Sequence, residues 1–153
     1  MTKKIIGIIL IYLFSSCSDK NKSDKIIYDC LLDKVTSKDT LYVTNENEGC
    51  FGGDKEIIKI YTQSDSMFAS YLWRHYDTTI LLKAPLNDSS IAIFQKFEKQ
   101  GRNFKNIMGL CTSTYTYEAK INTDKFTFID KDCYFDLYER FLKRTFVFPK
   151  LND

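Results

Sequence analysis

The sequence contains few of the residue types from which most recognisable active sites are built. It has a single histidine, His75, and no two of its five cysteines are only three positions apart. Zinc sites usually need such closely spaced cysteines together with histidines, so no metal site is expected. The serine-centred GxSxG motif of many hydrolases and the lysine-containing phosphate loop are also missing. Taken together, these absences predict no cofactor and no catalytic residue.

The sequence also has little net charge. It carries 22 basic and 20 acidic residues, a formal net charge of +2. Lys3 and Lys4 lie in an N-terminal segment that we expect to be removed, which would leave the two signs balanced. A neutral domain lacks the basic footprint of nucleic-acid-binding proteins, and no long charge run suggests a surface for anionic lipids. Nucleic acid is therefore not an expected partner.

No apolar run is long enough to span a membrane. The longest, residues 5–14, is about half the length of a transmembrane helix, which needs roughly 20 residues. It follows two lysines and precedes two serines and Cys17, after which residues 18–25 are all polar or charged. A basic start, an apolar centre and small residues before a cleavage point are typical of an export signal.

The stretch Leu-Phe-Ser-Ser-Cys that ends at Cys17 resembles the signal of bacterial lipoproteins, although its phenylalanine stands where that group usually has leucine. The resemblance implies that residues 1–16 are a signal peptide and that Cys17 carries a diacylglycerol thioether and an amide-linked acyl chain such as palmitate. Two or more acyl chains anchor a protein stably. The protein would then be exported and held on a bacterial membrane, at the outer membrane or the periplasmic face.

The alternative to this lipid anchor is an ordinary secretory signal cleaved nearby, which would leave Cys17 as an unpaired thiol. The composition, rich in Lys, Asn and Ile and poor in Ala, is also similar to that of small lipoproteins of Bacteroidota. Residues 17–25 would form the lipidated cysteine and a polar tether. Residues 26–153 have the size of one disulfide-stapled globular domain.

Four further cysteines predict two disulfides in this exported domain. They are Cys30, Cys50, Cys111 and Cys133, and four cysteines allow three pairings. Cys111 and Cys133 flank two strand-like runs and lie about equally far from the turn between them. An antiparallel ladder would place them side by side. We therefore predict the pair Cys111–Cys133, which leaves Cys30–Cys50 as the second.

Alternation of apolar and polar residues predicts short β-strands along most of the domain. The expected strands are residues 25–32, 40–44, 56–62, 67–74, 78–84, 112–121 and 124–129. Residues 45–54, rich in Asn and Glu and containing two adjacent glycines, are expected to form a loop.

Two segments have helical rather than strand periodicity. Residues 88–100 follow good N-cap residues and place Phe94 and Phe97 on one side, with Glu98 among the solvated residues of the other. Residues 132–146 form the second helix, with large apolar residues toward the core. The predicted fold is α+β, an antiparallel sheet of about five to seven strands with both amphipathic helices packed on one face.

One cluster of residues could form a recognition surface: Tyr71, Trp73, Arg74, His75 and Tyr76. Tyr, Trp and Arg are enriched at binding hot spots, which favours a binding patch. Large aromatic residues are also commonly buried, which favours simple core packing. His75 has an aspartate two residues later, but no nucleophile accompanies it, so catalysis is not expected there.

These observations predict a non-enzymatic binding or inhibitory module of the cell envelope, of the kind that immunity proteins represent. Its partners would be the bilayer, through acylated Cys17, and an envelope or secreted protein. Two other functions stay open at this point. One is an envelope-polymer hydrolase that uses carboxylates, whose spacing only the fold can set. The other is a structural envelope component; a calcium site in residues 45–49 is a further, fainter possibility.

Overall fold

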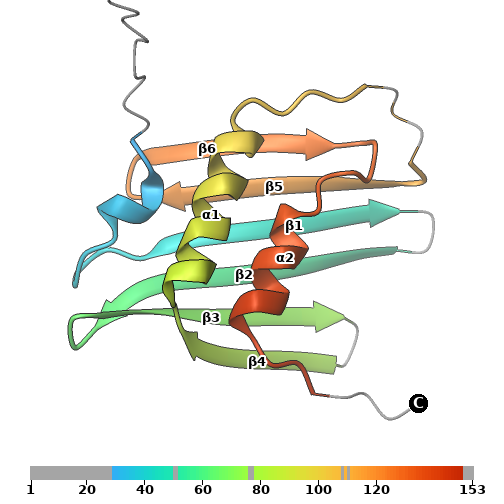
Figure 1. Cartoon of the computed structure of the whole chain (residues 1–153). Coiled ribbons are helices and arrows are strands. Elements are labelled where there is room, and N and C mark those ends of the chain that lie inside the picture. The colour runs from blue at the N-terminus through green and yellow to red at the C-terminus, as the bar shows by residue number, and fades with distance from the viewer. Residues whose placement is uncertain (1–28, 50–51, 76–77, 108, 110, 150–153) are drawn as a thin grey trace, which may run out of the picture.

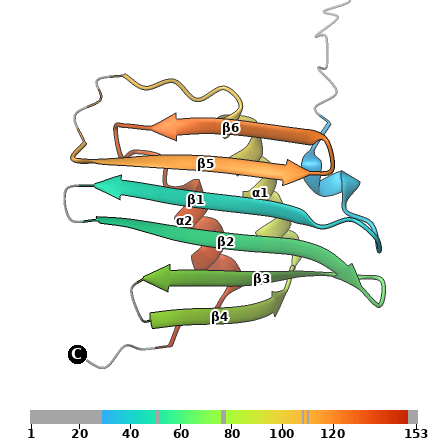
Figure 2. The same cartoon turned by 180° about the vertical axis from the view of Figure 1, so that it is seen from behind.

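The computed structural model describes residues 29–49, 52–75, 78–107, 109 and 111–149, and the signal and tether lie outside them. It contains one antiparallel sheet of six strands in the order β4-β3-β2-β1-β5-β6, and two α-helices. Both helices lie in front of the sheet in Figure 1, and the sheet covers them when the molecule is turned by 180° in Figure 2. The predicted α+β class and strand number are confirmed. The elements are η1 (Leu31–Lys34), β1 (Leu41–Gly49), β2 (Gly52–Gln63), β3 (Ser66–His75), β4 (Thr78–Pro85), α1 (Asp88–Gly101), β5 (Ser113–Ile121), β6 (Asp124–Asp130) and α2 (Leu137–Thr145).

Six of the seven predicted strands are present among the described residues. The exception is the predicted strand at residues 25–32, because Leu31–Lys34 forms the short 3-10 helix η1 and residues 25–28 lie outside the described part. The loop predicted for residues 45–54 is also wrong, since β1 continues to Gly49 and pairs with β2. Backbone hydrogen bonding between these strands outweighs their polar composition.

The two helices cover the apolar face of the sheet through a cluster of aromatic rings. Phe97 of α1 contacts Tyr117 of β5 and Phe128 of β6, with ring centroids 6.1 and 5.9 Å apart. Tyr138 of α2 lies 5.4 Å from the same Tyr117 ring, and Phe94 and Phe141 join the helices to each other at 5.4 Å. Both helices therefore stand on one face, and burial of these rings is the main stabilising interaction of the domain.

Helix α2 begins five residues later than its sequence pattern suggests. The Asp130 carboxylate accepts hydrogen bonds from the backbone N–H groups of Asp132 and Phe135, at 2.9 and 3.0 Å. Cys133 between them has a positive φ of 56°, outside the right-handed helical region. The acidic residues before the helix thus hold an irregular turn together instead of capping a helix. Phe135 is nevertheless buried, as predicted.

The predicted Cys111–Cys133 disulfide is confirmed, with Cα atoms 5.8 Å apart. The predicted pair Cys30–Cys50 is wrong, because Cys30 is a free, buried thiol. Cys50 lies outside the described residues, next to Gly49 at the end of β1. Figure 1 shows η1, which follows Cys30, at the opposite end of β1. A nine-residue strand is about 30 Å long, whereas bridged cysteines need Cα atoms within about 7 Å.

Gly101, the last residue of α1, lies directly against Phe128. A Cβ atom at this position would stand 2.5 Å from Cε1 of that ring. Alanine usually stabilises a helix relative to glycine by about 1 kcal/mol. Here we expect Gly101→Ala to lower the free energy of unfolding by roughly 1–3 kcal/mol, because the enclosed ring has no room to move. Chemical denaturation of the full chain measures this, with the exposed Gln100→Ala as control. A stabilised Gly101→Ala protein would contradict the packing.

Candidate functional site

A small polar cavity interrupts the apolar core beneath α2. Its volume is about 130 Å³. Four strands and α2 contribute to its wall, toward the end of the sheet where β1 and β2 connect. The lining residues are Asn45, Asn47, Asp54, Glu56, Trp73, Tyr115, Tyr117, Tyr138, Glu139 and Leu142.

The strand register explains why these residues meet. Side chains on alternate residues of a strand share a face, and paired residues on neighbouring strands lie side by side. Asn45 pairs with Glu56 on one side and with Tyr117 on the other, and Glu56 pairs with Trp73. The next core-facing row consists of Tyr115, Asn47 and Asp54. Two cross-strand rows thus form the floor of the cavity, and α2 forms its roof.

Glu56 is the best-anchored polar group of the floor. Its Oε1 accepts a hydrogen bond from the Tyr71 hydroxyl at 2.6 Å, and its Oε2 accepts one from Asn45 Nδ2 at 2.9 Å. Both donors are neutral. The carboxylate is therefore held in a fixed position by its neighbours while its charge is left without a basic partner among the described side chains.

Among the described residues, three polar atoms of the cavity lining have no hydrogen-bond partner at an ordinary distance: Asn45 Oδ1, Asn47 Oδ1 and the hydroxyl of Tyr138, which lies near the Glu56 carboxylate. Asn45 is 7% exposed and Tyr138 is 2% exposed. An unsatisfied buried polar atom costs about 1–3 kcal/mol, so native proteins rarely keep one without water or a ligand. Three together in one cavity indicate a place for a polar occupant.

The tyrosine hydroxyls of this region stay protonated. Burial raises the pKa of Tyr138 well above its usual value, and the neighbouring Glu56 charge raises it further. Burial and the hydrogen bond to Glu56 do the same to the pKa of Tyr71, and burial raises the pKa of Tyr117. Tyr71, Tyr117 and Tyr138 are therefore neutral over the whole physiological pH range.

The structure separates the residues of the predicted recognition patch. Tyr71 is buried and packs on Phe146, as the core-packing interpretation has it, and Trp73 borders the cavity. Arg74 alternates to the other face of β3 and is exposed. The His75 side chain and Tyr76 lie outside the described part.

The sequence reading missed Asn45, Asn47 and Glu56 as site residues. A signal for them exists in the alternation of the first two strands. The core-facing positions of β1 are apolar at Leu41 and Val43 and then turn polar, and those of β2 are polar before Ile58. A strand whose inward positions switch from apolar to polar indicates a polar pocket at that end.

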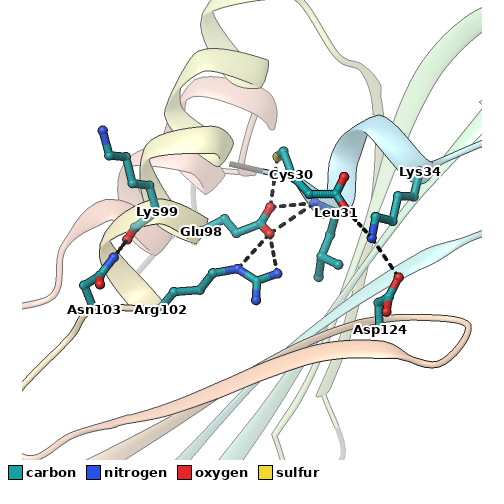
Figure 3. A network of polar contacts seen from close by, with 9 residues as sticks. Cys30, Leu31, Lys34, Glu98, Lys99, Arg102, Asn103 and Asp124 are labelled. Carbon is teal, nitrogen blue, oxygen red and sulfur yellow. Dashed lines mark hydrogen bonds and ion pairs between the residues drawn. The ribbon is translucent and has the colours of Figure 1, made fainter. Parts of the chain in front are cut away.

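A second buried polar network lies at the other end of the sheet (Figure 3). The Glu98 carboxylate, 0% exposed, accepts hydrogen bonds from the Leu31 backbone N–H at 2.9 Å and from Arg102 Nη2 at 2.7 Å. The Cys30 thiol donates to the same carboxylate at 2.9 Å. Glu98 was expected on the solvated side of α1, and that expectation is wrong. These hydrogen bonds link the N-terminal segment to α1.

The Cys30 thiol should be chemically inert in the folded protein. Burial and then the Glu98 contact raise its pKa to about 12, while an unfolded cysteine ionises near 8.5. Stabilisation from the protonated thiol is complete below about pH 8.5 and is lost as the pH rises toward 12. We expect iodoacetamide at pH 8 to leave Cys30 unlabelled in the native chain and to label it in urea, by peptide mass spectrometry. Native labelling would contradict its burial.

A wider hollow of about 500 Å³ lies on the opposite face of the sheet. Its lining includes Asp39, which accepts hydrogen bonds from Thr36 and Asn122, and Glu118, which accepts one from Thr127. These groups already have partners, in contrast to those of the cavity beneath α2. We therefore treat the cavity, and not this hollow, as the candidate functional site.

No protein-family model matches the chain, and no curated protein is significantly similar to it in sequence. Within the described ranges no helix is long and apolar enough to cross a membrane. The side chains described also include no group of three or more His, Cys, Asp or Glu residues arranged to hold a metal ion. In residues 45–49 the two asparagines and the two glutamates point to opposite faces of β1, so they do not converge as calcium ligands.

Proposed function

We propose that the protein is an exported, lipid-anchored binding module of a bacterial envelope, and that its ligand places a polar group in the cavity beneath α2. The observation that carries this proposal is the pair Asn45 and Tyr138. Each is more than nine-tenths buried, borders the cavity and keeps a polar atom without a hydrogen-bond partner at an ordinary distance among the described residues. A fold retains such groups at a cost in stability, which is common at functional sites.

The position of the cavity supports an anchored binding role. The described chain begins at Asp29 beside η1, while the cavity lies toward the β1–β2 connection at the other end of the sheet (Figure 1). A tether from Cys17 to Asp29 spans at most about 40 Å. An acyl anchor at Cys17 would thus attach to the domain at the end opposite the cavity, through a tether long enough to leave the cavity accessible.

The anchor is tested by the intact mass of the full chain extracted from membranes. The proposal expects a protein that begins at Cys17 and carries the added mass of its acyl groups. The control is Cys17→Ala, which should retain its signal peptide or be cleaved elsewhere without acylation. An unmodified Cys17 in the native protein would refute the anchor.

The binding role is tested with three immobilised forms of the full chain: wild type, Asn47→Val and Thr116→Val. Asn47 lines the cavity, whereas Thr116 alternates to the uncovered face of β5. Envelope extract is passed over each form, and the retained molecules are quantified by mass spectrometry. A ligand of the cavity should be retained by wild type and Thr116→Val and lost from Asn47→Val. If no molecule distinguishes the three forms, the cavity is not a binding site.

Hydrolysis of an envelope polymer is the second candidate function, because the carboxyl groups of Asp54, Glu56 and Glu139 all border the cavity. A glycosidase needs one carboxyl group that starts protonated. Glu56 accepts hydrogen bonds on both oxygens, and Glu139 is paired with Lys143 at 2.9 Å on the exposed side of α2. Both of these carboxyl groups are thus already engaged by neighbouring side chains, so binding ranks first. Turnover of cell-wall glycans that disappears in Glu56→Gln would reverse the order.

A further inference from the structure

We propose that the group held in the cavity is an organic cation, a primary ammonium or a guanidinium. It would be presented by a small amine or by a lysine or arginine side chain of a partner. This inference rests on the proposed function and names the chemistry of its ligand.

The unpartnered atoms of the cavity call for a ligand that donates hydrogen bonds. Asn45 donates one amide N–H to Glu56, and its Oδ1 accepts no hydrogen bond. Asn47 also has a free Oδ1, whereas the protonated Tyr138 hydroxyl lies near the Glu56 carboxylate and can donate to it. An ammonium group carries three N–H donors and no acceptor, and a guanidinium carries five donors and no acceptor. Both groups match a wall of free oxygen atoms.

The charge of the cavity favours a cation. Glu56 is partly buried, and its two hydrogen-bond donors, Tyr71 and Asn45, are neutral. None of the described residues that line the cavity is basic. Asp54 and Glu139 also border it, but each has a partner of its own, so the argument rests on Glu56. A carboxylate removed from water is costly unless an opposite charge accompanies it. A bound cation would supply that charge, whereas an anion would be repelled.

Aromatic rings form much of the remaining wall. Trp73, Tyr115, Tyr117 and Tyr138 all border the cavity, and the Tyr117 and Tyr138 rings lie 5.4 Å apart. Cations bind favourably against the faces of aromatic rings, and tryptophan gives the strongest such contact. A cation held between a carboxylate and an aromatic ring occurs elsewhere in this protein. The Arg102 guanidinium binds the buried Glu98 carboxylate and lies 4.8 Å from the centre of the Phe126 ring.

The size of the cavity limits what part of the ligand it holds. A volume of about 130 Å³ corresponds to about four water molecules. That is enough for a guanidinium group, or for an ammonium with a few methylene groups. A sugar ring, with about three times as many atoms, would extend beyond it. The cavity therefore suits the tip of a basic side chain or a short amine.

Trp73 provides a direct readout, because it is the only tryptophan of the chain and it borders the cavity. The full chain in detergent micelles is titrated with ethylguanidinium and propylammonium chloride at constant ionic strength. N-ethylurea and propanol serve as neutral analogues, and calcium chloride as a metal-ion control. We expect a saturable change in Trp73 emission in the millimolar range for the organic cations alone, since so small a group offers little contact area.

A second arm identifies the source of the cation. Short peptides with one arginine are compared with the same peptides carrying citrulline, its neutral analogue. If the arginine peptides bind no more tightly than the free cations, the ligand is a small amine or guanidine. If the arginine peptides bind at least tenfold more tightly than the free cations and the citrulline peptides do not bind, the cation is a side chain of a partner. Both results support the inference.

Two variants tie the response to the cavity. Glu56→Gln should weaken cation binding at least tenfold, because it removes the charge but keeps an acceptor for Tyr71. Glu118→Gln removes the same charge from the opposite face of the sheet and should change binding less than twofold. Circular dichroism checks folding; if Glu56→Gln does not fold, Asn47→Val takes its place, with an expected weakening of at least about threefold.

Three results would overturn the inference: equal responses to neutral analogues, saturation by calcium, or cation binding that Glu56→Gln and Asn47→Val leave unchanged. A complete lack of response to every cation and arginine peptide would overturn it as well. If, in that case, Asn47→Val still loses a ligand from envelope extract, the binding function stands and only its cationic chemistry is wrong. If neither experiment responds, both proposals fail.

Discussion

Replacement of Glu98 by alanine should lower the free energy of unfolding by about 2–4 kcal/mol. The change leaves the buried Leu31 N–H without its carboxylate acceptor and removes the ion pair between Glu98 and Arg102. It also detaches the N-terminal segment from α1, since Cys30 and Leu31 hold this helix through the same carboxylate. Equilibrium denaturation of the full chain, at constant detergent and pH, gives the loss.

Two further substitutions separate the network from simple helix effects. Glu98→Gln keeps an acceptor for the Leu31 N–H, so about half of the loss should be recovered. Lys99→Ala, one residue further along α1 and exposed, should change stability by less than about 0.5 kcal/mol. A loss below about 1 kcal/mol for Glu98→Ala would mean that the carboxylate is solvated, as its sequence context suggests.

Phe97→Ala should produce the largest loss of stability in the domain, about 3–5 kcal/mol. The Phe97 ring is 1% exposed and contacts rings of α1, β5, β6, the turn before α2 and α2 itself. Its removal deletes a large buried apolar side chain and leaves a cavity that the surrounding rings cannot fill without moving. Thermal and chemical unfolding both measure this loss.

The control for Phe97→Ala is Gln95→Ala, on the exposed side of the same helix. That change should be nearly neutral, because alanine and glutamine are both good helix formers. A loss of only about 1 kcal/mol for Phe97→Ala would contradict the placement of α1 over β5 and β6.

The sequence predicts the elements that have one buried face. Residues 113–121 alternate strictly because their core-facing side chains meet the helices, and the same pattern places Phe126 and Phe128 on the core side of β6. The α1 pattern is equally clear from Phe94 and Phe97. In each case a local period of two or 3.6 residues records burial by the rest of the fold.

Features that depend on contacts between residues far apart in the chain are not predictable from local sequence patterns. The sequence pattern predicts a solvated Glu98 because its partner Leu31 lies 67 positions away. It predicts a disulfide at Cys30 because the true partner of this thiol, the Glu98 carboxylate, is equally distant in the sequence. The cavity needs the register of four strands and the placement of α2, neither of which local periodicity contains. Its polar residues consequently resemble those of a loop, and residues 45–54 were predicted as one.

The central claim is that the polar lining of the cavity serves a ligand and not the fold. The most direct test is the free energy of unfolding of Asn47→Val in the absence of ligand. Asn47 Oδ1 has no hydrogen-bond partner, and valine suits a strand better than asparagine. We predict a stability that is unchanged or up to about 1 kcal/mol higher than that of the wild type. A loss of more than about 1 kcal/mol would show that Asn47 stabilises the fold and would contradict the claim.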